Sequence, residues 1–325
     1  MLIRKLAAAL AVSVLAFGPS AASAQAWPAK PVKVVSPYSS GSGPDVFLRV
    51  VGDKLSRQWG QQVLVDARAG ANGFIAIESV KKAAPDGYEM LLVGNAHATI
   101  NPNLFAKIPY DIEADFTPVA MLYRTPFYIT VAANGPYRNV ADIIAAAKAE
   151  PGKLTYGTPY VGSPAHLGSV NLELLTGTRM IHVPFKDTVQ IYASVGNGDV
   201  SWAFGTIGST LPIVKTGKAR LIAVAAKTRS PGMPDVPTIG EAGGPAGLEV
   251  DAWVAIMAPK RTPAEIVRRV NAEVSKLLGD ADIRDRLNVL GFEAYPATPE
   301  QVSEIIRTDL RKNADLVRRT GAKAD

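Results

Sequence analysis

The sequence of 325 residues contains no cysteine. Disulfide bonds, closed zinc sites built on thiolates and a lipid anchor on an N-terminal cysteine are therefore not expected. Such a chain must be held together by its apolar core, and 47% of its residues are hydrophobic. We expect a freely diffusing protein rather than a lipoprotein.

Residue types that hold metals or nucleotides are also scarce. The three histidines, His97, His166 and His182, are far apart and form no H-E-x-x-H motif. The pattern Gly41-x-Gly43 would need a third glycine where Val46 stands, and no G-x-x-x-x-G-K-[ST] loop occurs. We therefore expect no metal, no nucleotide and no other cofactor.

The sequence has no long run of one charge. The formal net charge is +6, and basic residues are interleaved with acidic ones, as in RRVNAEVSKLLGDADIRDRL. Such interleaving is typical of solvated helix faces and not of nucleic-acid-binding surfaces. We expect no nucleic-acid partner, and the mild positive excess is compatible with an anionic small ligand.

The longest apolar stretch lies near the N-terminus, from Leu6 to Phe17, and is shorter than the roughly 20 residues of a membrane span. It follows Arg4 and Lys5 and precedes the small-x-small motif Ala22-Ser23-Ala24. This order is typical of an export signal. We predict that residues 1–24 are a signal peptide, cleaved near Ala24/Gln25, and that the mature protein is periplasmic.

The rest of the chain alternates short apolar runs with segments of helical periodicity. This alternation predicts βαβ units and an α/β fold with mainly parallel sheets flanked by helices. Roughly 300 residues after the signal suggest two domains, at about 100–200 residues each. Helical patterns run through residues 48–59, 75–83, 140–149 and 167–175. The predicted strands are Val32–Ser36, Val63–Asp66, Glu89–Gly94, Phe127–Ala133, Leu154–Gly157, Met180–Val183, Val200–Phe204 and Leu221–Ala225.

The last quarter of the chain is predicted to be helical and carries two start signals. The segments Thr262-Pro263-Ala264-Glu265 and Thr298-Pro299-Glu300-Gln301 both combine an N-cap threonine, a proline at the first helical position and Glu or Gln to complete a capping box. Two apolar stripes follow, which we interpret as core packing: Ile266, Val270, Val274 and Leu277, then Val302, Ile306 and Leu310.

Two strand–turn–helix segments carry similar residues. SPYSSGSGPD (36–45) and LTYGTPYVGSPAHLGSV (154–170) both place Tyr, Gly, Ser and Pro just before a helix. Free backbone N–H groups and the positive end of a helix dipole favour an anion there, and serine hydroxyls add donors. Two such turns, one in each domain, predict a carboxylate site between them. Asp45 would repel an anion, so we expect it to face away and to fix its own loop.

A serine hydrolase is the enzymatic alternative. Ser39, Ser40, Ser42 and Ser163 stand in strand-to-helix turns, but none belongs to a G-x-S-x-G motif. A Ser–His–Asp set could still assemble from residues distant in sequence, so this alternative stays open.

Several segments, taken in order, carry a family resemblance. They are WPAKPVKVVSPYSSGSGPDV, AAPDGYEMLLVGNAHATINPNLF, DFTPVAML, PGKLTYGTP, HVPFK, GKARLIAVA and RSPGMPDVPTIGEAG. From about Trp27 to its C-terminus the chain resembles the Bug family of periplasmic solute receptors. These TctC-like proteins are the binding-protein component of tripartite tricarboxylate transporters.

The resemblance implies a two-lobed periplasmic-binding-protein fold (Venus flytrap, type II-like) with one ligand between the lobes. Residues 25–123 and 252–325 would form lobe one, residues 124–251 lobe two, and the hinge crossings would lie near 121–130 and 251–258. Two loops would hold the ligand carboxylate through backbone amides, and further residues would line the cleft. The implied ligand-binding residues are Tyr38, Ser39, Ser40, Gly41, Ser42, Gly43, Asn95, His97, Thr158, Tyr160, Val161, Gly162, Ser163, His166, Phe185, Lys186 and Gly205.

Three positions depart from the family pattern. Ser40-Gly41-Ser42 stands where the family usually has Ala-Gly-Gly, Asp187 where it commonly has Gly, and Gly205 where it often has Asp. The missing acid would leave an ammonium group without a partner, so we expect a ligand other than an amino acid. Gly205 would also leave space for a bulkier ligand, such as an aromatic carboxylate.

We therefore predict a monomeric receptor without enzymatic activity. It would bind a small di-, tri- or aromatic carboxylate and deliver it to membrane permease subunits. A sensory adaptor for a membrane kinase is a second alternative, because docking surfaces leave no sequence motif. Which carboxylate is bound does not follow from the sequence.

Overall fold

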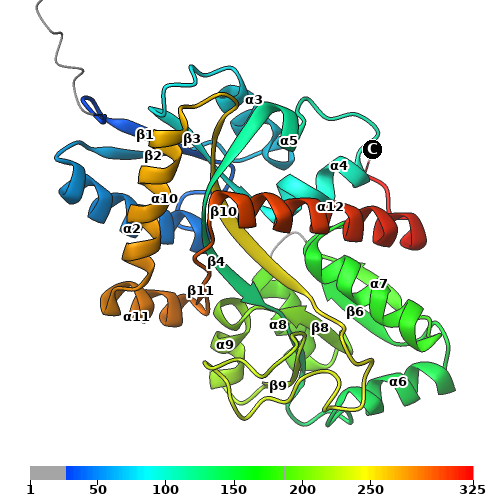
Figure 1. Ribbon diagram of the computed structural model, residues 1–325. Helices are drawn as coiled ribbons and strands as arrows, with labels where there is room; N and C mark the ends of the chain where they lie inside the picture. Colours follow the sequence, from blue (N-terminus) through cyan, green and yellow to red (C-terminus); the bar gives the residue numbers. More distant parts are fainter. Residues whose placement is uncertain (1–26, 186–187, 325) are drawn as a thin grey trace, which may run out of the picture.

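The computed structural model describes residues 27–185 and 188–324 (Figure 1). The predicted signal peptide with its cleavage site, and the positions Lys186 and Asp187, lie outside these residues. Every helix in the described part of the chain is too short or too polar to serve as a membrane span.

Lobe one is built on a sheet of six strands in the order β11-β4-β10-β3-β1-β2. β1 pairs in parallel with β2 and β3, whereas β10 pairs antiparallel with β3 and β4, and β11 antiparallel with β4. The strands are β1 (Val32–Ser36), β2 (Val63–Ala67), β3 (Glu89–Gly94), β4 (Phe116–Pro126), β10 (Asp251–Pro259) and β11 (Glu293–Ala294).

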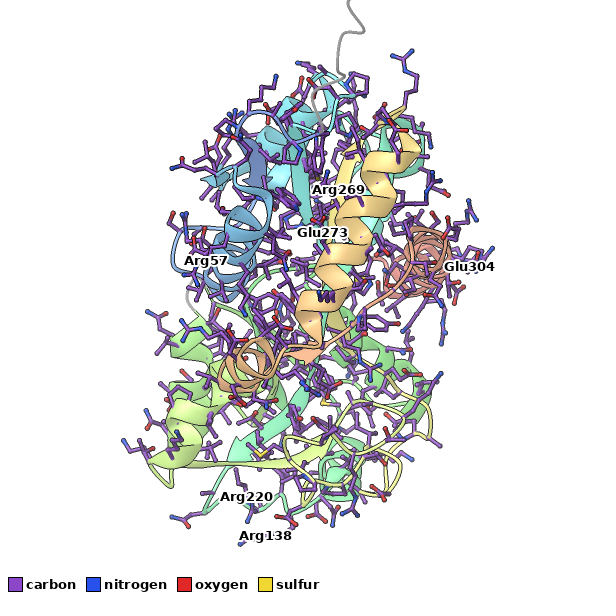
Figure 2. The ribbon with its side chains drawn as sticks, turned by 60° about the vertical axis from the view of Figure 1, so that its left-hand side comes forward. Arg57, Arg138, Arg220, Arg269, Glu273 and Glu304 are labelled. Carbon is purple, nitrogen blue, oxygen red and sulfur yellow. The ribbon has the colours of Figure 1, made fainter. Side chains whose placement is uncertain are left out.

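Helices cover both faces of this sheet. Side chains of β10 alternate between the two faces: Val254 and Ile256 join one apolar cluster, Trp253 and Met257 the other. The first cluster is completed by α2 (Gly43–Trp59), α10 (Ala264–Leu278) and α11 (Ala281–Leu290), the second by α3 (Phe74–Lys81) and α12 (Pro299–Thr320). Charged side chains such as Arg269 and Glu273 of α10 lie on the outer surface (Figure 2). The shorter helices of lobe one are η1 (Ala71–Gly73), η2 (Ala96–Ile100), α4 (Asn101–Leu104) and α5 (Ile112–Asp115).

Lobe two is built on a sheet of five strands in the order β7-β6-β8-β5-β9. β6 pairs in parallel with β7 and β8, and β5 pairs antiparallel with β8 and β9. The strands are β5 (Tyr128–Ala132), β6 (Thr155–Thr158), β7 (Ile181–Pro184), β8 (Trp202–Gly205) and β9 (Ala219–Val224). The helices are α6 (Val140–Ala149), α7 (Pro164–Thr176), α8 (Thr188–Asn197) and α9 (Ile207–Lys215).

The chain passes between the two sheets at two neighbouring points. It leaves lobe one after β4 ends at Pro126 and returns at Asp251, where β10 begins. The two crossing segments lie side by side, because Asp251 is paired with Pro126 and Phe127 N donates a hydrogen bond to Val250 O. The C-terminal α12 lies along the boundary between the lobes and packs against α4 of lobe one and α7 of lobe two (Figure 1). At the two crossings, the lobes are joined only by single segments of chain, at 126–127 and 250–251.

The α/β class is confirmed, but the sheets are mixed. The βαβ units give the parallel pairs that the alternating pattern predicts, and the crossing strands β4, β5 and β10 add antiparallel pairs. The predicted apolar stripe of α10 is buried at all of its positions.

The two predicted capping boxes have different outcomes. Thr298 and Gln301 form the predicted box, because each side chain accepts a hydrogen bond from the backbone N–H of the other. The box at Thr262 was wrong. The Thr262 hydroxyl donates to the carbonyl of Pro259 instead, and Pro263 occupies the N-cap position.

We expect Thr298→Ala to lower the free energy of unfolding by about 1 kcal/mol, because it removes the cap of α12, the longest helix among the described residues. Urea denaturation followed by circular dichroism would measure the loss. Thr308→Ala, in the exposed middle of the same helix, is the matched control and should change stability little, since alanine is the better helix former. Equal stability of the two variants would contradict the prediction.

Candidate functional site

The carboxyl ends of parallel strands from both lobes face the space between the lobes. β1 and β3 end there in lobe one, and β6 and β8 end there in lobe two. Loops that follow such strand ends are the usual position of ligand sites in open α/β sheets. The sequence segments 36–45 and 154–170, although far apart along the chain, are thereby brought to the same cleft.

Two adjoining cavities occupy this cleft and share a wall formed by Tyr38, Thr188, Thr206, Ser209 and Ala252. The first, which we call the α7 cavity, has a volume of about 240 Å³. Its other lining residues are Asn95, Ala96, Phe127, Pro159, Tyr160, Ser163, Pro164, Ala165, Tyr192 and Phe204. The second, the α11 cavity, has a volume of about 490 Å³. Its other lining residues are Gly43, Pro44, Tyr123, Thr125, Gly208, Val254, Val289, Leu290 and Phe292.

The N-termini of four helices open on these cavities. They belong to α2 at Gly43, α7 at Pro164, α8 at Thr188 and α9 at Ile207–Gly208. The first N–H groups of a helix have no carbonyl one turn earlier to bind, and the helix dipole places partial positive charge at the same end. The cleft therefore concentrates hydrogen-bond donors contributed by both lobes.

The described residues that line the two cavities include no Asp, Glu, Lys or Arg. An anion in the cleft would thus be held by backbone dipoles and hydroxyl groups. Nor do three or more His, Asp or Glu side chains gather closely enough to hold a metal ion anywhere in residues 27–185 and 188–324.

The first loop is fixed from behind by Asp45, as expected. Asp45 is 1% exposed, and its carboxylate accepts hydrogen bonds from Gly41 N at 2.8 Å and from the Arg49 guanidinium at 3.0 Å. Burial acts to raise the pKa of Asp45, but the bonds from Arg49 and Gly41 outweigh it and hold the pKa below its ordinary value. The negative charge is thereby neutralised within the loop.

Tyr38 and Tyr160, one from each loop, line the same cavity. The Tyr38 hydroxyl lies against the Cα of Gly94, where any side chain would collide with it. Burial, and to a smaller extent the neighbouring Tyr160, raises the pKa of Tyr38 well above its ordinary value. Tyr38 therefore stays a neutral phenol, able to donate a hydrogen bond at any physiological pH.

The second loop is held by its own backbone and side chains. Ser163 is the N-cap of α7, and its Oγ accepts from His166 N at 3.1 Å. The His166 ring accepts from Gly162 N through Nδ1 at 3.2 Å. Burial, reinforced by nearby His182, lowers the pKa of His166 to about 4, so the ring is neutral at pH 7.

Gly162 also marks a contact between the lobes. Its φ angle of +84° lies in the left-handed region, and a β-carbon there would collide with Leu104 of lobe one. Leu104 belongs to a buried cluster that joins the lobes through Leu167 of α7 and Leu316 of α12. Glycine is thus required both by the backbone and by the neighbouring lobe.

Hydroxyl groups at the starts of α8 and α9 belong to the site, although no motif pointed to them. Ser209 Oγ lies 3.1 Å from Thr206 Oγ1 and 3.2 Å from the Tyr192 hydroxyl, which in turn donates to Phe204 O. Together with Thr188 these side chains form a polar wall in lobe two.

The expectation that Gly205 leaves space for a ligand was wrong. A β-carbon at Gly205 would meet the Tyr192 hydroxyl at 2.5 Å and would also collide with Thr210. The space beside this glycine is therefore filled by the protein itself.

The other predicted site residues fall into three groups. The cavities are lined by Tyr38, Gly43, Asn95, Tyr160 and Ser163. The exposed positions on the two loops are Ser39, Ser40, Gly41 and Val161. Ser42, directly before α2, is partly buried. Behind the loops lie His97, Thr158, Gly162, His166 and Phe185, none of which lines either cavity. Lys186 is outside the described residues.

The histidine rings are engaged away from the serines of the loops. His97 Nδ1 accepts from Gly94 N at 3.4 Å, and His182 Nε2 lies 2.6 Å from Thr158 Oγ1. Burial lowers the pKa of His97 to about 4. The described residues thus contain no hydrogen bond between a serine hydroxyl and a histidine ring, the pair on which the hydrolase alternative was based.

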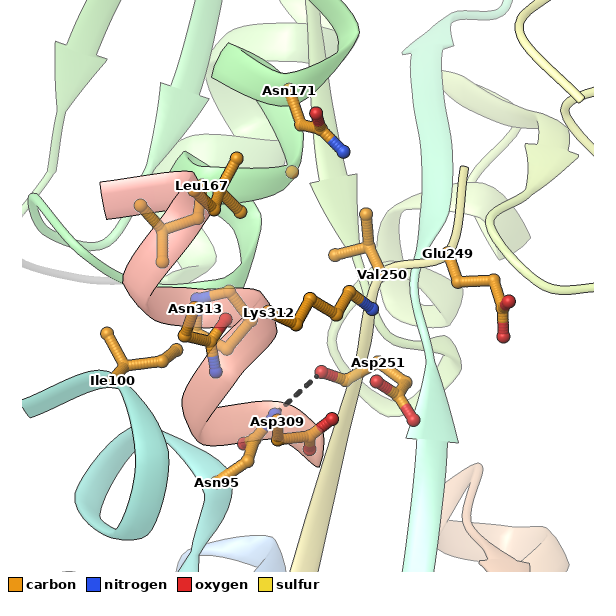
Figure 3. Close-up of a pocket in the computed structure, with 13 residues that line it drawn as sticks. Asn95, Ile100, Leu167, Asn171, Glu249, Val250, Asp251, Asp309, Lys312 and Asn313 are labelled. Carbon is orange, nitrogen blue, oxygen red and sulfur yellow. Dashed lines mark hydrogen bonds between the residues drawn. The ribbon is translucent and has the colours of Figure 1, made fainter. Parts of the chain in front are cut away.

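A third, smaller cavity of about 40 Å³ lies beside the second crossing and has room for about one water (Figure 3). Asn95 Nδ2 donates to the carbonyl of Asp251 at 3.0 Å, and the Trp253 ring donates to Asp309 at 2.6 Å. Burial raises the pKa of both aspartates, and Asp309 adds to the effect on Asp251, while Lys312 opposes it. We call this cavity the hinge pocket; its other lining residues are Ile100, Pro164, Leu167, Gly168, Asn171, Glu249, Val250, Asn313 and Leu316.

Comparison with known proteins gives one consistent family. A family model described as tripartite tricarboxylate transporter family receptor matches residues 47–322. Among curated proteins, a UPF0065 protein of Bordetella bronchiseptica is 34% identical over 298 residues, which cover 92% of this chain and 88% of that protein.

Solved structures agree with this match. Rpa4515 of R. palustris, solved with adipate, superposes with a TM-score of 0.81 at 30% identity and covers 91% of this chain and 99% of its own. MatC (Rpa3494) from Rhodopseudomonas palustris, with bound malate, gives 0.75 at 29% identity, with coverages of 90% and 100%. The periplasmic binding protein BugD gives 0.76 at 26% identity, with coverages of 92% and 100%.

We expect the aspartates of the hinge pocket to make stability fall as the pH rises. The pKa values of Asp251 and Asp309 in the folded protein are raised above about 3.9, the value in the unfolded chain. The folded protein therefore binds more protons than the unfolded chain as the pH rises above about 3.9, and its free energy of unfolding falls over this range. Asp309→Asn can still accept from Trp253, and should be at least as stable as the wild type at pH 7. It should also lose less stability between pH 4 and pH 7.

Urea denaturation at pH 4 and pH 7 would measure both effects. Asp315→Asn, a more exposed carboxylate on the same helix, is the matched control. A larger loss of stability at pH 7 for Asp309→Asn than for Asp315→Asn would contradict the prediction.

Proposed function

The chain belongs to the tripartite tricarboxylate transporter receptor family, and on this basis we propose that it binds a small organic carboxylate in the cleft between its lobes. The observation that carries the proposal is the convergence of four helix N-termini on cavities whose described lining has no charged side chain. Such a site favours an anion without supplying a base or a nucleophile. The related receptors solved with adipate and malate hold ligands of this class.

The residues that carry binding in this proposal come from both lobes. From lobe one we propose Tyr38, Ser42 and Gly43, and from lobe two Tyr160 and Ser163. The polar wall of Thr188, Thr206 and Ser209 adds donors that the sequence did not indicate. The remaining predicted loop residues would shape and support the two loops.

Hydrogen bonds of this kind are strong enough for a receptor. Each bond to a charged group contributes about 1.5–3 kcal/mol, and micromolar affinity corresponds to about 8 kcal/mol. Several donors that bind one desolvated carboxylate supply enough free energy for micromolar affinity, even after the cost of ordering the ligand and the lobes is subtracted.

We further propose that residues 25–123 with 252–325, and residues 124–251, move as two lobes that close on the ligand. The narrow double crossing and the apolar contact of Gly162 with Leu104 support this motion. The closed monomer would then pass the carboxylate to membrane permease subunits of the transporter, in the periplasm, after removal of residues 1–24. In this role no chemical change of the ligand takes place.

Ser42 provides a test of the start of α2. It lines neither cavity itself but stands directly before Gly43, which lines the α11 cavity, and its buried Oγ has no hydrogen-bond partner within the described structure. Ser42→Ala should therefore leave the free energy of unfolding unchanged or slightly raised. It should weaken the binding of a carboxylate such as adipate or malate by about tenfold or more, since a bond to a charged group is lost. Isothermal titration calorimetry and urea denaturation would measure the two quantities.

Ser39→Ala is the matched control, because Ser39 is exposed on the same loop. It should change neither quantity. Wild-type affinity in Ser42→Ala would remove this residue from the site, and failure of di-, tri- and aromatic carboxylates alike to bind the wild type would contradict the proposed function.

A further inference from the structure

The α11 cavity is larger than a small dicarboxylate requires. Its volume of about 490 Å³ corresponds to roughly 16 water molecules at about 30 Å³ each. The adjoining α7 cavity adds about 240 Å³. A four-carbon acid held at the shared wall would leave most of the α11 cavity filled with water.

One wall of this cavity is apolar. Phe292 and Tyr123, which both line it, stack with their ring centroids 3.9 Å apart and their planes 2° apart. Val254 and Leu290 extend this wall, and Val289 stands at the rim with 71% of its surface exposed. A ligand that covers such an exposed aliphatic side chain removes apolar surface from water, and this burial favours binding.

The hydroxyl groups of lobe two form another part of the cavity lining. Thr188, Thr206 and Ser209 belong to the wall that the two cavities share. A carboxylate at this wall would have the starts of α8 and α9 as partners, while the rest of the ligand faced the apolar wall. The start of α2 at Gly43 also opens on this cavity, but most of the wall around Val254 and Phe292 offers a second carboxylate no partner to replace its hydration.

We infer that the ligand carries one carboxylate on an extended apolar body, aromatic or aliphatic, and that this body occupies the α11 cavity. The inference rests on the proposed function and narrows it to a substrate class. Val289 and Phe292 then select for the uncharged far end, while the helix N-termini bind the carboxylate.

Hexanoate and adipate test the inference, because both have six carbons and differ only in whether the far end is a methyl group or a carboxylate. Isothermal titration calorimetry of the mature protein should give at least tenfold tighter binding of hexanoate, and of 3-phenylpropanoate, than of adipate. Val289→Lys should weaken hexanoate and tighten adipate, because it places a cation at the far end. Val289→Thr, of similar shape and without charge, should leave the ratio of the two affinities within about twofold.

Tighter binding of adipate than of hexanoate to the wild type would overturn the inference and leave the carboxylate receptor standing. An unchanged ratio of hexanoate to adipate affinity in Val289→Lys would also overturn the inference, because the end of the ligand opposite the bound carboxylate would then lie away from Val289. Failure of hexanoate, 3-phenylpropanoate and adipate alike to bind would overturn the inference, and malate or a tricarboxylate, added to the same protein, would show whether the proposed function fails with it.

Discussion

The antiparallel pairing of β4 with β10 is the constraint on which the rest of the structure depends. Nine residue pairs, from Asp251 with Pro126 to Pro259 with Phe116, hold the outgoing and returning segments together. The two crossings between the lobes are therefore adjacent, which is the geometry that the proposed rotation of the lobes about one short line needs. The same pairing turns the carboxyl ends of β1, β3, β6 and β8 toward a common space, so that loops from distant parts of the sequence meet there.

Much of this fold could be predicted from local sequence. β1 and β3 have the predicted bounds, and the other predicted strands differ by one or two residues at one or both ends, because short apolar runs between helices leave little choice of pairing. Periodicity did not reveal β4, which contains Pro118 and Pro126, or α9, whose interior holds Pro212. The family resemblance supplied the crossings that periodicity missed, and the family match and solved structures confirm both the receptor family and its two-lobed fold.

The site was less accessible to prediction, for a physical reason. Tyr38, Asn95, Tyr160 and Ser163 follow strand ends and line the cleft, as their position in the sequence suggested. Thr188, Thr206 and Ser209 are single hydroxyl residues without a motif, and only the packing of α8 and α9 brings them together. Conversely, His97, His166 and Gly205 stand in the right segments, but burial and neighbouring side chains keep them behind the surface.

The neutrality of the described cleft lining has a consequence for the conditions under which a receptor works. Fixed backbone dipoles do not titrate, and at hydrogen-bond distance from a buried ligand they are hardly screened by dissolved ions. The neighbouring rings of His97 and His166, with pKa values of about 4, stay uncharged in all but strongly acidic surroundings. The ligand affinity of such a protein would depend little on ionic strength, and little on pH over several pH units above 4. Its environment could change without altering what it captures.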